Sequence, residues 1–120
     1  MKNLTFDWIR RSDGTSEFIA FMNTLPQKDQ AKLYAIISLT EEHGIEIAKK
    51  MKWTKKLRDG ICELRSKQGS DTQRVLYFHN QGEEYIITHG FTKKTDVVPA
   101  QEIERSRRMR DEYLKDEENE

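Results

Sequence analysis

The side chains best suited to chemistry in this sequence are cations that lie in, or just after, short apolar segments. They are Arg65, Arg74, His89, Lys93 and Lys94. If the apolar segments are neighbouring strands of one sheet, these cations can meet on one face of it. Arginines would then stabilise the charge that builds on a phosphate when the RNA 2′-hydroxyl attacks it. A lysine or histidine whose pKa is lowered by nearby cations would transfer the proton, so the set predicts RNA cleavage without a metal ion.

Each of these residues also has a structural interpretation that the sequence leaves open. Arg65 and Arg74 could be surface cations that pair with acids. His89 follows an apolar segment and could be a packed histidine, while Lys94 could begin a turn. The chemical hypothesis therefore depends on where the fold places the five side chains.

Other catalytic chemistries lack their sequence patterns here. The three histidines and the acidic residues do not show the spacing of zinc or two-metal sites, so we expect no metal and no cofactor. There is no glycine-rich phosphate loop and no nucleophile elbow. Cys62 is the single cysteine, which excludes an intramolecular disulfide and fits a small core residue.

The formal net charge of zero hides an uneven distribution of charge along the chain. Residues 111–120 hold six acids and one lysine, which leaves 20 basic and 15 acidic side chains in residues 1–110, a net of +5. The densest basic stretch contains Lys49, Lys50, Lys52, Lys55, Lys56 and Arg58. Such a stretch can bind a polyanion through phosphate contacts, although it can equally be a solvated surface.

A length of 120 residues predicts one domain over residues 1–120. Apolar and charged residues each make up 35% of the chain, so we expect a modest core under a highly charged surface. No stretch is long and apolar enough for a signal peptide or a membrane span. We therefore expect a cytoplasmic protein with no membrane partner.

The first half of the chain changes from strand periodicity to helix periodicity. Residues 3–10 alternate loosely in the manner of a strand. Residues 15–25, and the stretch from Pro26 to Gly44, place apolar side chains at helical spacing, which predicts a helical hairpin. Residues 45–60 are ambiguous and allow only a short helix and an irregular connection.

The second half of the chain carries three strand signals and a last helix. Residues 61–66, 73–78 and 85–89 are separated by turn residues and predict an antiparallel meander that the first strand can join. A helix is expected over about residues 99–114, and a frayed acidic tail over about residues 115–120. The expected fold class is α+β, an antiparallel sheet with an N-terminal helical hairpin and a C-terminal helix.

Several blocks of the sequence resemble one known family when they are taken together and in order. The blocks are Lys56-Leu57 with Gly60-Ile61-Cys62-Glu63-Leu64-Arg65, then Gln73-Arg74-Val75-Leu76-Tyr77-Phe78, then His89-Gly90-Phe91-Thr92-Lys93-Lys94-Thr95, and finally Pro99 with Glu102-Ile103. They resemble the phage-derived branch of the HigB/RelE toxins of type II toxin–antitoxin systems. The similarity spans roughly residues 15–113, which is nearly the whole domain.

This resemblance implies a RelE-like fold and a function in the control of translation. Such a toxin docks in the ribosomal A site, cleaves mRNA there as an endoribonuclease, and is neutralised by a cognate antitoxin, in this branch usually a helix-turn-helix protein similar to HigA. The matching positions imply catalytic roles for Arg65, Arg74 and the pair Lys93-Lys94. Thr92 and Lys93 stand where better-known members carry a catalytic tyrosine or histidine, so the general base stays open, with His89 as a further candidate.

Two alternative functions follow from the same sequence. ParE-like toxins share the fold and bind DNA gyrase, but they lack the cation set formed by Arg65, Arg74 and the lysine pair. A nucleic-acid-binding regulator without catalysis is the other alternative, although no helix-turn-helix pattern or aromatic stacking platform is visible. The cation set favours the ribosome-dependent endoribonuclease, whose partners would be the ribosome, mRNA and the antitoxin.

Overall fold

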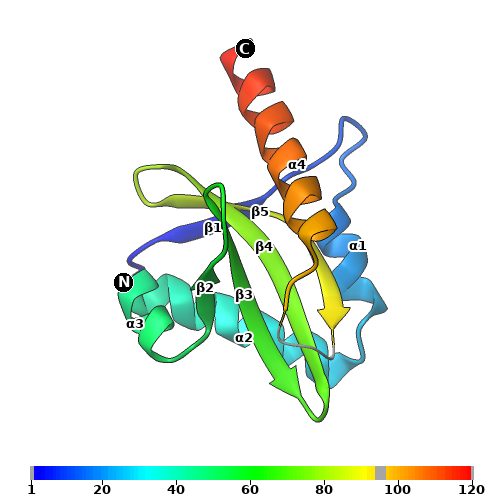
Figure 1. The fold of residues 1–120 in the computed structure, drawn as a ribbon, viewed down its shortest axis with the longest axis vertical. Coiled ribbons are helices and arrows are strands. Elements are labelled where there is room, and N and C mark those ends of the chain that lie inside the picture. Colours follow the sequence, from blue (N-terminus) through cyan, green and yellow to red (C-terminus); the bar gives the residue numbers. More distant parts are fainter. Residues whose placement is uncertain (1, 94–96, 120) are drawn as a thin grey trace.

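A computed structural model describes residues 2–93 and 97–119 and shows helices on both faces of one sheet (Figure 1). In chain order the elements are β1 (Thr5–Trp8), α1 (Glu17–Thr24), α2 (Gln27–His43), α3 (Ile45–Lys50), β2 (Thr54–Lys56), β3 (Ile61–Gln68), β4 (Asp71–Gln81), β5 (Glu84–Lys93) and α4 (Ala100–Glu118). The α+β class expected from the sequence is confirmed. Among the described helices, none is long and apolar enough to cross a membrane.

The described residues form a five-stranded sheet in the order β1-β5-β4-β3-β2. The meander of β3, β4 and β5 is antiparallel, as the strand signals predict. The expectation of a wholly antiparallel sheet is wrong, because β1 joins the edge of β5 in parallel, with Thr5 beside Glu84 and Trp8 beside Ile87. Alternating apolar residues identify a strand but carry no information about its direction.

The helices before β2 pack differently from the expected hairpin. Helix α1 begins after Ser16, whose hydroxyl accepts a hydrogen bond from the Ile19 N–H (3.3 Å), and it packs mainly on β5. Helix α2 ends at Gly44, whose φ of +90° favours glycine, and it packs on β3 and on α3. The hairpin prediction is therefore wrong, because the sheet, together with the additional helix α3, supplies the apolar partners of these helices.

Two further boundaries differ from expectation. The ambiguous residues 45–60 contain both α3 and the short edge strand β2. Helix α4 continues to Glu118, beyond the helix end expected at about residue 114. Glutamate and lysine have high helix propensity, and this last stretch therefore stays helical without being packed. In Figure 1 the end of α4 projects beyond the rest of the fold.

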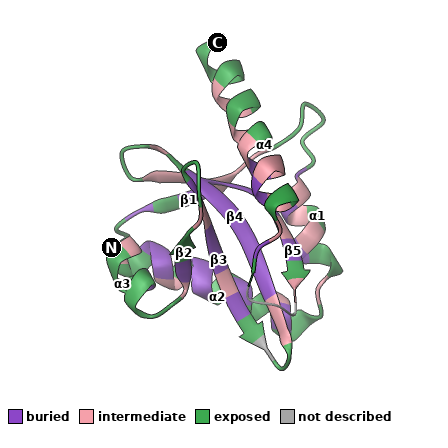
Figure 2. Cartoon of the chain, in the orientation of Figure 1, coloured by how far each residue is buried: buried purple, intermediate pink, exposed green. Residues whose placement is uncertain are grey.

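Two apolar clusters fill the space on either side of the sheet. On one face, α1 and α2 bury Phe18, Met22 and Leu33 against the sheet. On the other face, α4 buries Ile103 against a cluster that includes Phe78. The buried strand positions consequently gather on β3, β4 and β5, whereas the outer side of α4 is exposed (Figure 2).

A glycine in β5 allows α1 to approach the sheet closely. A Cβ atom added at Gly90 would come within 3.0 Å of three ring carbons of Phe21. The absence of a side chain at this position therefore sets the distance between α1 and β5. This gives a packing reason for the glycine between His89 and Phe91.

Candidate nucleic-acid interface

The strand register places the proposed catalytic cations on one face of the sheet. Arg65 lies directly opposite Arg74 on the neighbouring strand. His89 and Lys93 lie on β5, opposite Leu76 and Thr72. Leu76 and Thr72 are each two residues from Arg74 along β4 and therefore share its face. This is the face that carries α4. Lys94, the other member of the lysine pair, lies outside the described residues.

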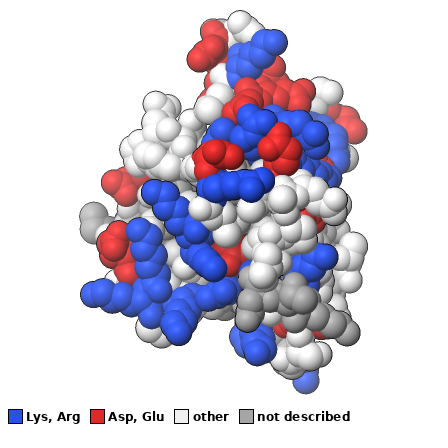
Figure 3. Space-filling model, viewed as in Figure 1, with Lys and Arg blue, Asp and Glu red and all other residues white. Residues whose placement is uncertain are grey.

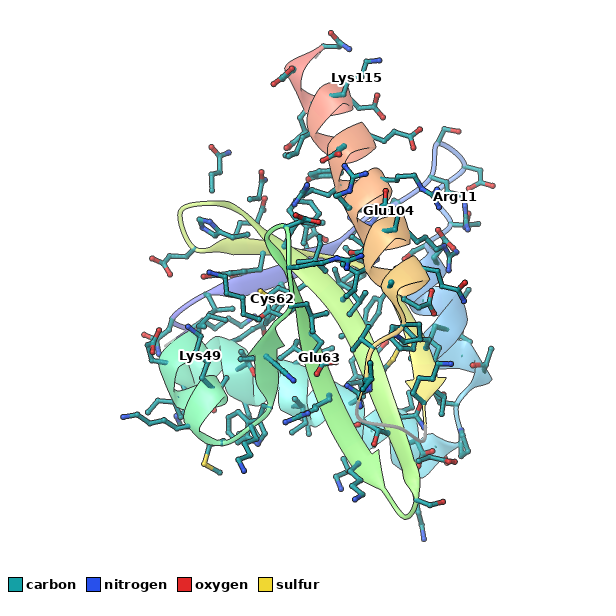
Figure 4. All side chains as sticks on the ribbon, in the orientation of Figure 1. Arg11, Lys49, Cys62, Glu63, Glu104 and Lys115 are labelled. Atoms are coloured by element: carbon teal, nitrogen blue, oxygen red, sulfur yellow. The ribbon has the colours of Figure 1, made fainter. Side chains whose placement is uncertain are left out.

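Arg74 is buried and its charge is balanced by an acid that the sequence reasoning did not single out. Its side chain is only 1% exposed, and Nη1 donates to Oε2 of Glu63 at 2.6 Å. Glu63 is also 1% exposed, and Figure 4 labels its side chain on β3. The sequence contained a signal for it, because an acid inside an apolar strand segment needs a partner as much as Arg74 does. The burial of Arg74 does not support direct contact with RNA and indicates a positioning role instead.

Arg65 reaches the surface and is held in place from two sides. Its side chain is 27% exposed, and Nη1 lies 3.7 Å from Oε1 of Glu63. Its Nε donates to the backbone carbonyl of Lys52 at 3.1 Å. Glu63 thus lies between the two arginines and offsets the repulsion between them, which leaves Arg65 as the arginine that a phosphate can reach.

His89 is enclosed between β5 and α4. Its side chain is 1% exposed, with Nε2 3.4 Å from Oε1 of Glu102 and Nδ1 3.1 Å from the Thr88 hydroxyl. The Thr88 hydroxyl in turn lies 2.7 Å from the hydroxyl of Ser106 in α4. Burial lowers the pKa of His89, and the opposing effect of Glu102 only partly offsets this. The contacts fit a neutral histidine that ties α4 to the sheet, which was the structural interpretation of this residue.

An open pocket of about 390 Å³ lies beside Arg65, where β3 continues beyond the residue that pairs with Thr54, the first residue of β2. It is lined by Lys32, Ile36, Lys52, Trp53, Arg65, Ser66, Lys67, Thr72 and Arg74. We call it the cationic pocket, because five of these residues are lysines or arginines. The sequence reasoning missed the contributions of Lys32 and Trp53, which come from α2 and from the connection before β2, far from the strand cations in the chain.

The basic stretch forms an exposed surface next to this pocket. Lys49 and Lys50 end α3, and Lys55 and Lys56 belong to β2. All six of its predicted RNA-binding cations are exposed, including Lys52 and Arg58. Figure 3 shows lysines and arginines gathered over this part of the molecule, whereas the charges on α4 alternate in sign.

Lys93 ends β5 opposite Thr72, which itself lines the cationic pocket. Its side chain is partly exposed. It is therefore closer to solvent than His89 is. Residues 2–93 and 97–119 contain no group of three or more His, Cys, Asp or Glu side chains that could hold a metal ion.

No curated protein matches this sequence. The sequence pattern of one family, described as "Phage derived protein Gp49-like (DUF891)", matches residues 20–111. The matched region runs from α1 into α4 and includes the whole cationic face and its pocket. Because it covers most of the chain, this protein belongs to the Gp49-like family of phage-derived proteins, a toxin-like family of toxin–antitoxin systems.

Proposed function

We propose that this protein is the toxin of a type II toxin–antitoxin pair and cleaves mRNA on the ribosome. The observation that carries the proposal is the cationic pocket, in which Arg65 is partly exposed and lies near the exposed basic stretch from Lys49 to Arg58. Membership of the Gp49-like family supports the toxin part of the proposal. The resemblance to HigB and RelE supports the ribosome and mRNA as targets.

The proposed mechanism needs charge stabilisation and proton transfer at one phosphodiester. Arg65 donates to the nonbridging phosphate oxygens, where negative charge builds as the 2′-hydroxyl attacks. Arg74 holds Glu63, and Glu63 orients Arg65, so Arg74 acts at one remove from the RNA. Lys93 takes the proton of the attacking 2′-hydroxyl and delivers it to the 5′-oxygen as the bond between phosphorus and that oxygen breaks, which leaves a 2′,3′-cyclic phosphate and a 5′-hydroxyl. Lys94 keeps its proposed supporting role. His89 serves poorly as a base because α4 covers it.

The proposed partners follow from the exposed charges and from the family. The basic stretch from Lys49 to Arg58 holds the backbone of ribosomal RNA or mRNA, because lysine-rich surfaces bind phosphates without regard to sequence. A toxin-like family implies an antitoxin, which we propose to be a helix-turn-helix protein similar to HigA. Binding of that antitoxin must block either the cationic pocket or the basic surface.

A reconstituted translation reaction with a defined mRNA tests the proposal. The ends of the mRNA are mapped with and without the protein, and with ribosomes omitted in a parallel reaction. We expect new ends inside the reading frame only when ribosomes are present. Arg65→Ala should lower the cleavage rate by about 10²- to 10³-fold, the typical effect of losing one donor to the transition state. Arg108→Ala, which removes an exposed arginine on α4, is the matched control and should cleave at the parental rate.

Three results would contradict the proposal in different ways. Cleavage of free mRNA at the same rate would remove the ribosome from the mechanism. Intact mRNA together with inhibition of DNA supercoiling by gyrase would identify the ParE-like alternative. Intact mRNA together with ordinary nucleic-acid binding would identify a regulator without catalysis.

A further inference from the structure

We infer that the cationic pocket is a nucleotide subsite, in which one base of single-stranded RNA stacks on Trp53 while its phosphate lies between Arg65 and Lys67. This inference rests on the proposed function and adds to it a specific contact with a base. The sequence alone gave no stacking platform, because Trp53 lies in a connection of weak periodicity.

The pocket exists because β2 covers only part of the outer edge of β3. The pairing with β2 reaches only as far as Leu64, which lies opposite Thr54, the first residue of β2. Strand β3 continues beyond this point to Gln68. The last backbone link between the two segments is the hydrogen bond from the Arg65 N–H to the Trp53 carbonyl, at 2.9 Å. Beyond it, Lys32 from α2 donates to the carbonyl of Lys67. Side chains, and not another strand, therefore line this part of the edge.

Trp53 lines this opening and is half-buried, because its side chain also packs against the core cluster under α2, with its ring centroid 6.4 Å from that of His43. Hydrogen bonds fix its backbone. Its N–H donates to the Ala48 carbonyl at 2.9 Å, and its carbonyl accepts from Arg65. The residue before it, Lys52, has a φ of +63°, a conformation that L side chains rarely adopt. In that conformation the carbonyl of Lys52 accepts from Nε of Arg65. The carbonyls of Lys52 and Trp53 thus hold Arg65 next to Trp53 through two hydrogen bonds. Strained backbone of this kind is common at binding sites.

A buried hydroxyl in the pocket gives a second, independent indication of a polar ligand. Ser66 is 4% exposed and lines the pocket. Its Oγ has no hydrogen-bond partner among the described residues. Buried polar atoms are nearly always hydrogen-bonded in folded proteins. A polar atom of a bound ligand would satisfy this hydroxyl.

The composition of the pocket selects the class of ligand. None of the described residues that line the pocket is acidic, and although Arg65 and Arg74 both face Glu63, the lining also contains Lys32, Lys52 and Lys67, so an anionic ligand is favoured. An indole beside cations matches the way proteins hold single-stranded nucleic acid, with bases on aromatic rings and phosphates on lysines and arginines. Double-stranded RNA does not fit, because its stacked bases cannot reach an aromatic side chain.

Binding of a short single-stranded RNA to the free protein tests this inference without ribosomes. The probe is a 2′-O-methylated oligoribonucleotide, which lacks the attacking 2′-hydroxyl and cannot be cleaved by that route. Trp8→Phe leaves Trp53 as the single tryptophan, so its fluorescence reports on the pocket. We expect the oligonucleotide to quench this fluorescence, whereas an abasic oligonucleotide of equal length should bind more weakly and quench little.

Variants separate stacking from charge. Trp53→Leu should weaken oligonucleotide binding by about tenfold or more, and Trp53→Phe by much less, since phenylalanine still offers a stacking ring. Binding of the abasic oligonucleotide should be the same in both variants. Tyr34→Leu, at an exposed aromatic residue outside the pocket, is the matched control. Ser66→Ala should weaken binding by about two- to tenfold without lowering the melting temperature of the free protein.

The outcomes distinguish the subsite from the proposed function. Unchanged oligonucleotide affinity in a folded Trp53→Leu variant overturns the subsite, even if the parent protein cleaves mRNA on ribosomes. An equal loss for the normal and abasic oligonucleotides also overturns it, because the indole would then act only through the shape of the pocket. Base-dependent quenching by a protein that leaves mRNA intact supports the subsite and rejects the proposed nuclease.

Discussion

Glu63 and Arg74 lie on neighbouring strands but pair diagonally, because the residue directly opposite Arg74 is Arg65. The Glu63 carboxylate is 2.6 Å from Nη1 of Arg74, and the same carboxylate faces Arg65. Glu63 therefore faces both of the arginines that the sheet places side by side.

This arrangement makes Glu63 a critical residue for folding. Glu63→Gln should lower the free energy of unfolding by about 3–5 kcal/mol, because it removes the buried carboxylate charge that pairs with Arg74. Urea denaturation measures the change. Replacing both residues, with Glu63→Leu and Arg74→Met together, should recover most of the loss, so a double variant as unstable as the single one would contradict the buried-pair explanation.

Gly90 should tolerate no side chain while Phe21 occupies its present position. Gly90→Ala forces a methyl group into the Phe21 ring and should cost about 1–3 kcal/mol of stability. Thermal denaturation measures it. Phe21→Leu on the Gly90→Ala background should cost less than Phe21→Leu in the parent, since the smaller side chain relieves the clash. Strictly additive losses would show that the two residues do not compete for space.

The burial of His89 should lower the free energy of unfolding in acid. Its pKa is lowered from the ordinary value of 6.5 by burial, so the unfolded chain binds a proton at a higher pH than the folded protein does. The stabilising contribution of neutral His89 is complete above about pH 6.5 and is lost as the pH falls below it. His89→Gln should flatten the pH dependence between about pH 7 and pH 5, measured as unfolding free energy. An unaltered slope in that variant would assign the effect to other groups.

The basic surface should determine how ribosome binding depends on salt. Replacing Lys49, Lys50, Lys55 and Lys56 together by glutamate should weaken co-sedimentation with ribosomes and reduce its sensitivity to salt, without unfolding the domain. Lys28→Glu, at an exposed lysine near the start of α2, is the control and should bind as the parent does. Equal binding by the fourfold variant across a salt series would remove this surface from the interface.

Lys93 should respond to conservative substitution as a proton carrier does. Lys93→Arg should reduce mRNA cleavage by about 10²- to 10⁴-fold, because the pKa of arginine is too high for proton transfer. Lys67→Arg, at a lysine of the cationic pocket, should retain activity because it keeps the charge. If Lys93→Arg cleaves at the parental rate, proton transfer belongs to another group, with Lys94 the next residue to test.

The sequence predicted the strands and their cations better than it predicted the surroundings. Strand-forming residues separated by turn residues located β3, β4 and β5, and the register agrees with the hypothesis that neighbouring strands bring Arg65, Arg74 and His89 to one face. The sequence pattern of the strands could not show that α4 would cover His89, because burial depends on which element packs over a face. Apolar patterning within a strand is local, whereas the covering helix comes from elsewhere in the chain.

The cationic pocket could not be predicted from the sequence for a related reason. Its lining combines Lys32, Trp53 and Ser66 from three separate segments, and no spacing in the chain links them. The unusual backbone of Lys52 also leaves no trace in the sequence, since a lysine has no preference for positive φ. The direction of β1 was hidden as well, because parallel and antiparallel edge strands can carry the same alternation.

The parallel pairing of β1 with β5 has a consequence for how the chain folds during synthesis. Thr5 pairs with Glu84 and donates its N–H to the carbonyl of Glu83 at 2.9 Å, so β1 cannot join the sheet before this part of the chain has been made. Such a long-range contact closes late and slowly. A chain interrupted before β5 leaves both β1 and the edge of β4 bare, and bare strand edges invite aggregation and proteolysis. The sheet is therefore complete only after β5 has been synthesised. Only such a chain has the full set of strand cations together with the stability that the complete sheet provides.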